Sequence, residues 1–83
     1  MNNLIKIYIN KIKKDDVNIF LKNNNINLSE KEIDYAYYIL KNKYELILDN
    51  DVSIFNDIKD NISEDNYIKL MELYNNYKTK YFR

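Results

Sequence analysis

The sequence predicts an all-α fold, a small bundle of four to five helices in one domain that spans residues 1–83. Three observations predict it: apolar residues recur at helical spacing, two helices have serine-led starts, and one segment is nearly repeated. Because the chain is near the lower size limit for folding alone, we expect a small core and modest stability.

The clearest helix is expected over residues 30–48. Ser29 and Glu32 form a capping box, in which each side chain accepts a hydrogen bond from a backbone N–H at the helix start. Leu28 and Ile33 have the positions of a hydrophobic staple. The stripe that we expect to face the core is Ile33, Ala36, Tyr37, Leu40, Tyr44, Ile47 and Leu48.

A second serine-led start predicts a helix over residues 64–81. Ser63 has the cap position, and Glu64 and Asp65 place negative charge where the helix dipole favours it. Asn66 stands where the first box has glutamate, so the reciprocal half of this box is missing. The expected buried stripe is Tyr67, Leu70, Met71, Tyr74, Tyr77 and Tyr81.

A shorter helix is expected before each long one, near residues 16–24 and 51–60. The segment "DVNIFLKNNNINLSE" is echoed by "DVSIFNDIKDNISE", and we expect Asp16 and Asp51 to cap these helices. The spacing of about 34 residues is that of a tetratricopeptide, but the glycine, alanine and proline positions of that pattern are unfilled. Two related helical hairpins, or a coincidence within a narrow residue alphabet, are the alternatives.

Residues 2–13 fit two patterns. A helical stripe is formed by Leu4, Ile5, Tyr8, Ile9 and Ile12, and a strand-like alternation by Ile5, Ile7 and Ile9. A lone strand would leave its backbone N–H and C=O groups without partners, so we expect a helix. A strand would require pairing between two chains.

The composition excludes several classes of chemistry, because cysteine, histidine, glycine and proline are all absent. Without cysteine there are no disulfides or thiolate metal sites, and without glycine there is no phosphate-binding loop. The serines have no histidine to activate them. Turns that need a positive φ must use asparagine or aspartate. We therefore expect no enzyme, no catalytic residue and no cofactor.

One acidic segment has the ligand spacing of a calcium-binding loop. Asp49, Asp51, Ser53, Asp57 and Asp60 have the ligand positions, but the glycine position is Ile54 and the last ligand is not glutamate. We interpret Asp51 as a helix cap and the other acids as solvated, and expect no metal site.

The chain has no segment of the length that a membrane span needs. Its apolar runs are a few residues long, against the ~20 that a helix needs to cross a bilayer. Lys6 and Asn10 interrupt the first apolar stretch, so it lacks the core of a secretory signal. We expect no membrane association and a cytoplasmic location.

The first candidate site is a second apolar face on the long middle helix. Tyr35, Tyr38, Ile39 and Leu46 lie roughly opposite its main stripe. A helix that is apolar on both sides is either covered within its own fold, here by the N-terminal helix, or binds a partner. We expect a protein-interaction module that self-associates or sequesters a protein partner through this face.

The alternative is nucleic-acid binding by basic, tyrosine-bearing ends of the chain. The candidate residues are Lys11, Lys13, Lys14, Lys78, Lys80 and Arg83. If the first and last helices are neighbours, these residues form one surface that contacts phosphates. However, the net charge is zero and residues 49–66 hold six acidic groups against Lys59, which disfavours general polyanion binding.

The order of short motifs resembles the YqfT-like family, small helical proteins of Gram-positive bacteria with no assigned activity. The motifs are "NINLSE", Lys41 with Lys43, "SIF" and the final helix over residues 64–82. The glycine that usually follows the family's long helix is missing here. The resemblance implies a helical architecture and a bacterial origin, and it implies no functional residue.

Overall fold

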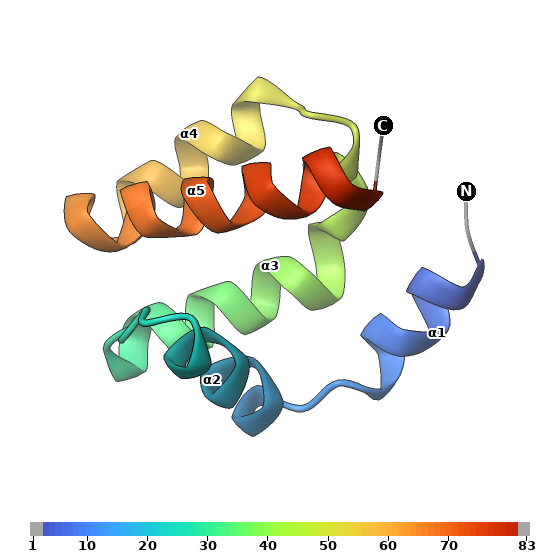
Figure 1. The fold of residues 1–83 in the computed structure, drawn as a ribbon, viewed down its shortest axis with the longest axis horizontal. Helices are drawn as coiled ribbons and strands as arrows, with labels where there is room; N and C mark the ends of the chain where they lie inside the picture. Colours follow the sequence, from blue (N-terminus) through green and yellow to red (C-terminus); the bar gives the residue numbers. More distant parts are fainter. Residues whose placement is uncertain (1–2, 82–83) are drawn as a thin grey trace.

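The computed structural model describes residues 3–81, which form five helices and no strand. The helices are α1 (Asn3–Lys11), α2 (Lys14–Asn23), α3 (Glu30–Leu48), α4 (Val52–Asn61) and α5 (Glu64–Tyr81). The predicted all-α bundle is therefore confirmed, and residues 3–11 are helical, not extended (Figure 1).

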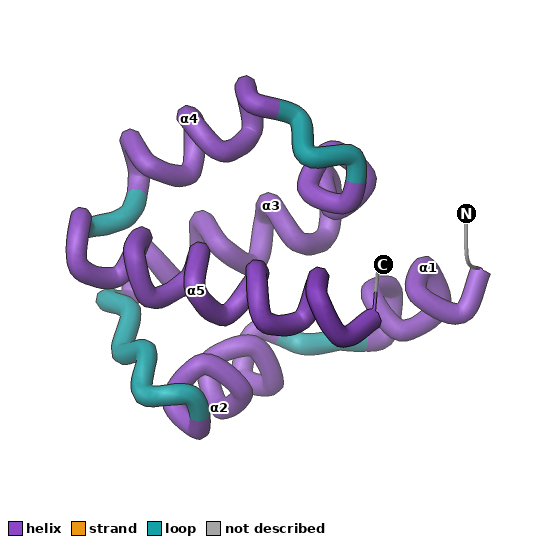
Figure 2. Tube along the Cα trace, turned by 45° about the horizontal axis from the view of Figure 1, so that its top comes forward, coloured by secondary structure: helices purple, strands orange, loops and turns teal. Residues whose placement is uncertain are grey.

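Helix α3 is the centre of the bundle. It packs against α1, α2 and α4, and α4 packs in turn against α5. Figure 1 shows α4 and α5 on one side of α3 and α2 on the other. In the tilted view of Figure 2, α5 lies between α4 and α2, in front of α3. The interior is thus bounded by α2, α3 and α4, and α5 covers it.

The core consists of two clusters of aliphatic side chains, one at each main helix interface. The α2–α3 cluster is Val17, Leu21, Ile26 and Ile33. The α3–α4 cluster is Ile39, Ile54, Ile58 and Ile62. Leu28 and Leu70 pack against both clusters, so they join two small cores into one.

The start of α3 has the predicted capping box. The Glu32 N–H donates to Ser29 Oγ at 3.2 Å, and the Ser29 N–H donates to Glu32 Oε1 at 2.9 Å. The start of α5 completes its own box with the same carboxylate. The Ser63 N–H donates to Glu32 Oε2 at 2.6 Å, and Asn66 Nδ2 donates to Oε1 at 3.2 Å. One glutamate therefore supports two helix starts.

The predicted cap at Asp16 is wrong. Helix α2 begins at Lys14 with Lys13 in the cap position, and Asp16 accepts the Lys13 N–H at 3.0 Å from the third helical position. Because α2 begins this early, α1 ends at Lys11 and not at residue 13. The predicted cap at Asp51 is confirmed, since its carboxylate accepts the Ser53 N–H at 2.9 Å.

This shift changes which side of the helix the repeated segment presents. Asp16 is the third residue of its helix, whereas Asp51 precedes the first residue of its own. Val17 is consequently buried, while its counterpart Val52 is 70% exposed. The two copies are alike in sequence, but this part of them packs differently.

Two asparagines turn the chain at the ends of α2 and α3. Asn25 has φ 64° and Asn50 has φ 58°, the left-handed conformation that we expected asparagine to supply. After each, a backbone N–H reaches back into the helix, from Ile26 to Leu21 O at 2.8 Å and from Asp51 to Leu46 O at 3.0 Å. These Schellman ends keep both connectors short.

Candidate functional site

The predicted partner surface on α3 is mostly covered by α4. Ile39 is 3% exposed within the α3–α4 cluster, and Tyr35 and Leu46 pack against that cluster. The Tyr35 hydroxyl donates to the Asp57 carboxylate on α4. Tyr38 is the exception, with 53% of its surface exposed. The expectation that the N-terminal helix covers this face is wrong, because the three-residue connector folds α4 back onto α3.

Burial and the Asp57 contact also change the acidity of Tyr35. Burial disfavours the phenolate, and the hydrogen bond to the Asp57 carboxylate stabilises the protonated hydroxyl. Both effects raise the pKa of Tyr35 above its ordinary value.

Two of the predicted basic residues are engaged in contacts within the described part of the fold. Lys14 Nζ pairs with Asp34 at 2.7 Å, and Lys78 Nζ donates to Asn50 Oδ1 at 3.1 Å. Lys11 and Lys13 are exposed. The side chain of Lys80 and the whole of Arg83 lie outside the described residues.

The tyrosines expected beside these lysines are engaged in the fold. The Tyr74 hydroxyl contacts Ile47 O and Asn50 Oδ1, both at 2.8 Å, and its ring packs against Phe55 with ring centroids 5.5 Å apart. Tyr77 packs against Phe20 on α2 with centroids 5.9 Å apart. Tyr74 therefore serves as a structural link to the α3–α4 connector.

The acidic segment behaves as a helix start. Within residues 3–81, no group of three or more acidic side chains is placed to hold a metal ion. Hydrogen bonds from the Ser53 hydroxyl and backbone N–H stabilise the Asp51 carboxylate and lower its pKa. Over the same residues, none of the helices combines the length and hydrophobicity that crossing a bilayer requires.

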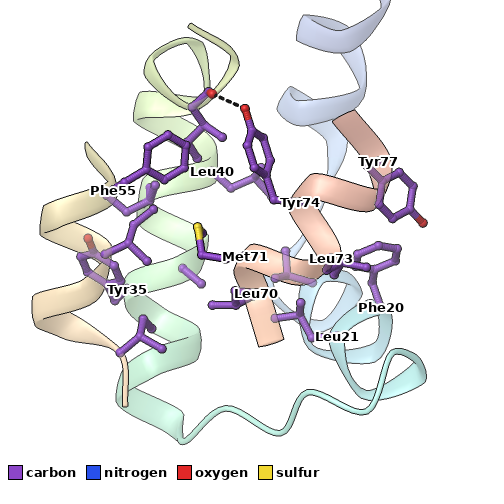
Figure 3. A pocket seen from close by; sticks show the side chains of 16 residues that line it. Phe20, Leu21, Tyr35, Leu40, Phe55, Leu70, Met71, Leu73, Tyr74 and Tyr77 are labelled. Carbon is purple, nitrogen blue, oxygen red and sulfur yellow. Dashed lines mark hydrogen bonds between the residues drawn. The ribbon is translucent and has the colours of Figure 1, made fainter. Parts of the chain in front are cut away.

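A concave feature lies beneath α5 and is called the α5 pocket below. It has a volume of about 390 Å³ and is lined by 16 side chains of the four helices α2 to α5 and their ends, none of them charged. Figure 3 shows Leu70, Met71 and Leu73 of α5 reaching towards Leu40 of α3 across this space. The volume is within the range of small-molecule sites.

The pocket exists because the backbone of α5 packs on α4 but lies away from those of α2 and α3. In the described part of the chain, no Cα atom of α5 comes within 8 Å of one in α2 or α3. Polar contacts hold its two ends, at Glu32 near its start and at Asn50 near Tyr74 and Lys78. Between these points the backbone of α5 lies more than 8 Å from the backbones of α2 and α3, measured between Cα atoms. Accordingly, none of its residues up to Thr79 is fully buried.

The size of the pocket matters for the stability of so small a domain. At ~24 cal/mol per Å³, a sealed void of about 390 Å³ would cost on the order of 9 kcal/mol. This cost is as large as the whole free energy of unfolding of many domains, ~5–15 kcal/mol. The pocket is in fact open on one side, so its apolar walls face solvent. Filling it with apolar atoms would stabilise the fold.

A second notable feature is the exposed apolar outer face of α1. Leu4, Ile7 and Tyr8 are all exposed, whereas Ile9 on the same helix is buried. Both views place α1 at the edge of the bundle, away from α4 (Figures 1 and 2). The face was hidden in the sequence because residues 2–13 are apolar on almost every side.

Sequence reasoning missed the α5 pocket entirely. Several lining residues lie on the predicted core stripes, but Tyr35 and Ile39 were expected on the partner face and Leu73 on neither stripe. Spacing along one helix also does not indicate how far that helix stands from its neighbours. One signal was present, since four tyrosines share the stripe of residues 64–81. A tyrosine hydroxyl needs a polar partner, which a filled aliphatic core lacks.

No protein-family model matches this chain, and no curated protein or solved structure matches it either. The resemblance to the YqfT-like family stays a prediction. The functional argument depends on the geometry of the chain itself.

Proposed function

We propose that the chain is a non-enzymatic helical interaction module that binds a second copy of itself through α1. The observation that carries the proposal is the outer face of this helix, where Leu4, Ile7 and Tyr8 are 73%, 50% and 65% exposed. The inner face is already occupied, since α1 packs on α3 and Ile9 is buried. An apolar helix face left in solvent is typical of an interaction surface.

The distribution of charge supports a second copy as the partner. Residues 1–14 carry four lysines and no acid, whereas residues 49–66 carry six acids and one lysine. Within one chain the two segments stay apart, because α1 packs on α3 and the described residues include no close approach of α1 to α4. In the proposed two-fold pair, the basic segment at α1 of each chain lies against the acidic segment 49–66 of its partner, which contains α4. Val52, exposed on α4, adds an apolar contact there.

The test is sedimentation velocity over a range of protein concentrations. We expect the wild-type chain to form dimers as concentration rises. The double variant Ile7→Glu with Tyr8→Glu places two charges on the outer face of α1 and should raise the dimer dissociation constant at least about tenfold. Its circular-dichroism spectrum should stay helical, because both side chains point away from the core.

The matched control is the double variant Ile19→Glu with Ile68→Glu, which adds the same two charges at exposed isoleucines of α2 and α5 and should leave dimerisation unchanged. Added salt should weaken the dimer, because charge attraction contributes to it. A wild-type chain that stays monomeric at every concentration, or a double variant that dimerises like the wild type, would contradict the proposal.

The surface predicted on α3 gives a second arm of the same experiment. Leu46 packs in the core, so its replacement by a charged residue would damage the fold. Tyr38→Glu changes an exposed residue and avoids this problem. Loss of dimers in Tyr38→Glu, together with normal dimers in the α1 double variant, would move the interface from α1 to α3.

Nucleic-acid binding stays the rival prediction. Its measure is the salt dependence of retention on nucleic acid, which should be steep and should flatten when Lys11, Lys13 and Lys78 are replaced by glutamine. Absence of retention at low salt would exclude it. The cytoplasmic location also stays a prediction of the sequence.

A further inference from the structure

Among the side chains described, those of the inner wall of the α5 pocket have no free polar group that could bind a ligand. The tyrosine hydroxyls of this wall are already engaged, Tyr35 with Asp57 and Tyr74 with Ile47 O. The remaining inner side chains are hydrocarbon, apart from the thioether of Met71. Recognition here must therefore rest on apolar contact, and a ligand group that needs hydrogen bonds would lose them.

The volume separates two kinds of apolar occupant. One turn of an α-helix with side chains is a cylinder of about 500 Å³, more than the 390 Å³ of the whole pocket. A whole helical turn of a partner therefore exceeds the pocket, and only its side chains would enter. If a methylene group takes about the 30 Å³ of a water molecule, the pocket accommodates on the order of ten carbons.

We infer that the pocket opens between α2 and α5 from the exposure of its lining side chains. Among its lining side chains, Phe20 and Tyr77 are the two with large exposed fractions, 42% and 38%, and they stand on these helices. Figure 3 shows this pair at one side of the pocket, away from Phe55 and Tyr35. A chain that enters there would lie against carbon over most of its length, and its polar head would stay in water.

We propose that the α5 pocket binds a single hydrocarbon chain of about ten carbons, as in a medium-chain fatty acid, with its head group at the Phe20–Tyr77 opening. Because no described Cα atom of α5 lies within 8 Å of one in α2 or α3, the chain has only side-chain contacts to part as it enters, such as the Phe20–Tyr77 ring pair. This site is distinct from the outer face of α1, since no α1 residue lines the pocket.

The two methionines of the chain supply the experiment, because Met71 lines the pocket and Met1 is the only other methionine. Protein labelled with ¹³C at the methionine methyl groups is titrated with sodium decanoate below its micelle concentration. We expect the Met71 signal to shift and saturate at one ligand per chain while the Met1 signal stays in place. Decanoyl lysophosphatidylcholine tests whether the chain is also accepted from a lipid.

Chain length gives a quantitative check on the wild-type protein. Octanoate has two methylene groups fewer than decanoate and so buries less apolar surface. Its dissociation constant should therefore be about fifteenfold higher than that of decanoate. Tetradecanoate should bind little more tightly than decanoate, because its extra carbons would extend beyond the opening.

A pocket-filling variant tests the location. Ala36→Phe places a ring in the pocket and should weaken decanoate binding at least about tenfold. Ile68→Phe adds a ring at an exposed site of α5 outside the pocket and should leave binding unchanged. If Ala36→Phe does not fold, the chain-length series still decides.

Three results would overturn the proposal. The first is a Met71 signal that decanoate does not shift, or shifts no more than that of Met1. The second is equal affinity for octanoate and decanoate. The third is a Met71 signal that changes on simple dilution of the protein, which would mean that a second copy fills the pocket.

Discussion

Replacing Glu32 by alanine tests whether one carboxylate supports the starts of α3 and α5. Its oxygens accept the Ser29 N–H at 2.9 Å, the Ser63 N–H at 2.6 Å and Asn66 Nδ2 at 3.2 Å. A cap interaction contributes ~1 kcal/mol, and two caps depend on this side chain, so the loss should be about 2 kcal/mol. For a domain of this size, that corresponds to a melting temperature about 8–16 °C lower.

The pH dependence follows from the same contacts. Burial by itself raises the pKa of Glu32, but hydrogen bonds from Ser29, Ser63 and Asn66 outweigh it and lower the pKa below the ordinary 4.5. A carboxyl whose pKa is lower in the folded state stabilises the fold above the ordinary pKa. This contribution disappears as pH falls through the folded-state pKa. The difference in stability between wild type and Glu32→Ala should therefore shrink in acid.

The assay is urea unfolding followed by circular dichroism at neutral pH and at several acidic pH values. Glu30→Ala is the matched control, since it removes a carboxylate from the same helix start without contacts to α5, and it should cost about 0.5 kcal/mol. Glu32→Gln, which keeps one acceptor oxygen, should lie between the control and Glu32→Ala. Equal stability of Glu30→Ala and Glu32→Ala would refute the shared cap.

Three further predictions concern single side chains. Asn25→Ala should destabilise the fold by about 1 kcal/mol because its φ is positive, whereas Asn25→Gly should be close to neutral; thermal unfolding distinguishes them. The raised pKa of Tyr35 means that the folded state disfavours its phenolate, so the stability it contributes is present below pH 10 and is lost as pH rises above it. Tyr35→Phe should lose about 1 kcal/mol with the Asp57 hydrogen bond and show a flatter alkaline unfolding profile than the wild type. Ile26→Ala, at a side chain that is 1% exposed, should cost about 3 kcal/mol in urea unfolding, while Val52→Ala should stay within about 0.5 kcal/mol.

The elements that could be predicted from the sequence are those specified by neighbouring residues. The box of Ser29 and Glu32 locates the start of α3, and the structure places that start at Glu30. The predicted cap at Asp16 is wrong because aspartate is favourable both as a helix cap and in the first turn of a helix. The residue type alone therefore does not distinguish the two positions. The choice is made by Val17 and Leu21, which must face α3.

The cover of the second α3 face required information about connectivity. Periodicity identifies an apolar face, but not the helix that packs on it. The connector between α3 and α4 is residues 49–51, and a short link favours antiparallel neighbours. The length of this connector, unlike the periodicity, indicates that α4 and not the N-terminal helix covers Ile39 and Leu46.

The α5 pocket reflects the chemistry of the stripe that faces it. If the stripe were purely aliphatic, α5 could pack closely on α3, with the side chains of the two helices interdigitated. Tyr74 prevents this, because its hydroxyl must reach a polar partner and finds one at Ile47 O on the rim of the interior. The Phe20–Tyr77 pair forms a second aromatic contact towards α2. These aromatic contacts at the edge of the interior keep α5 at a distance from α3. The proposed hydrocarbon ligand would occupy the space between them.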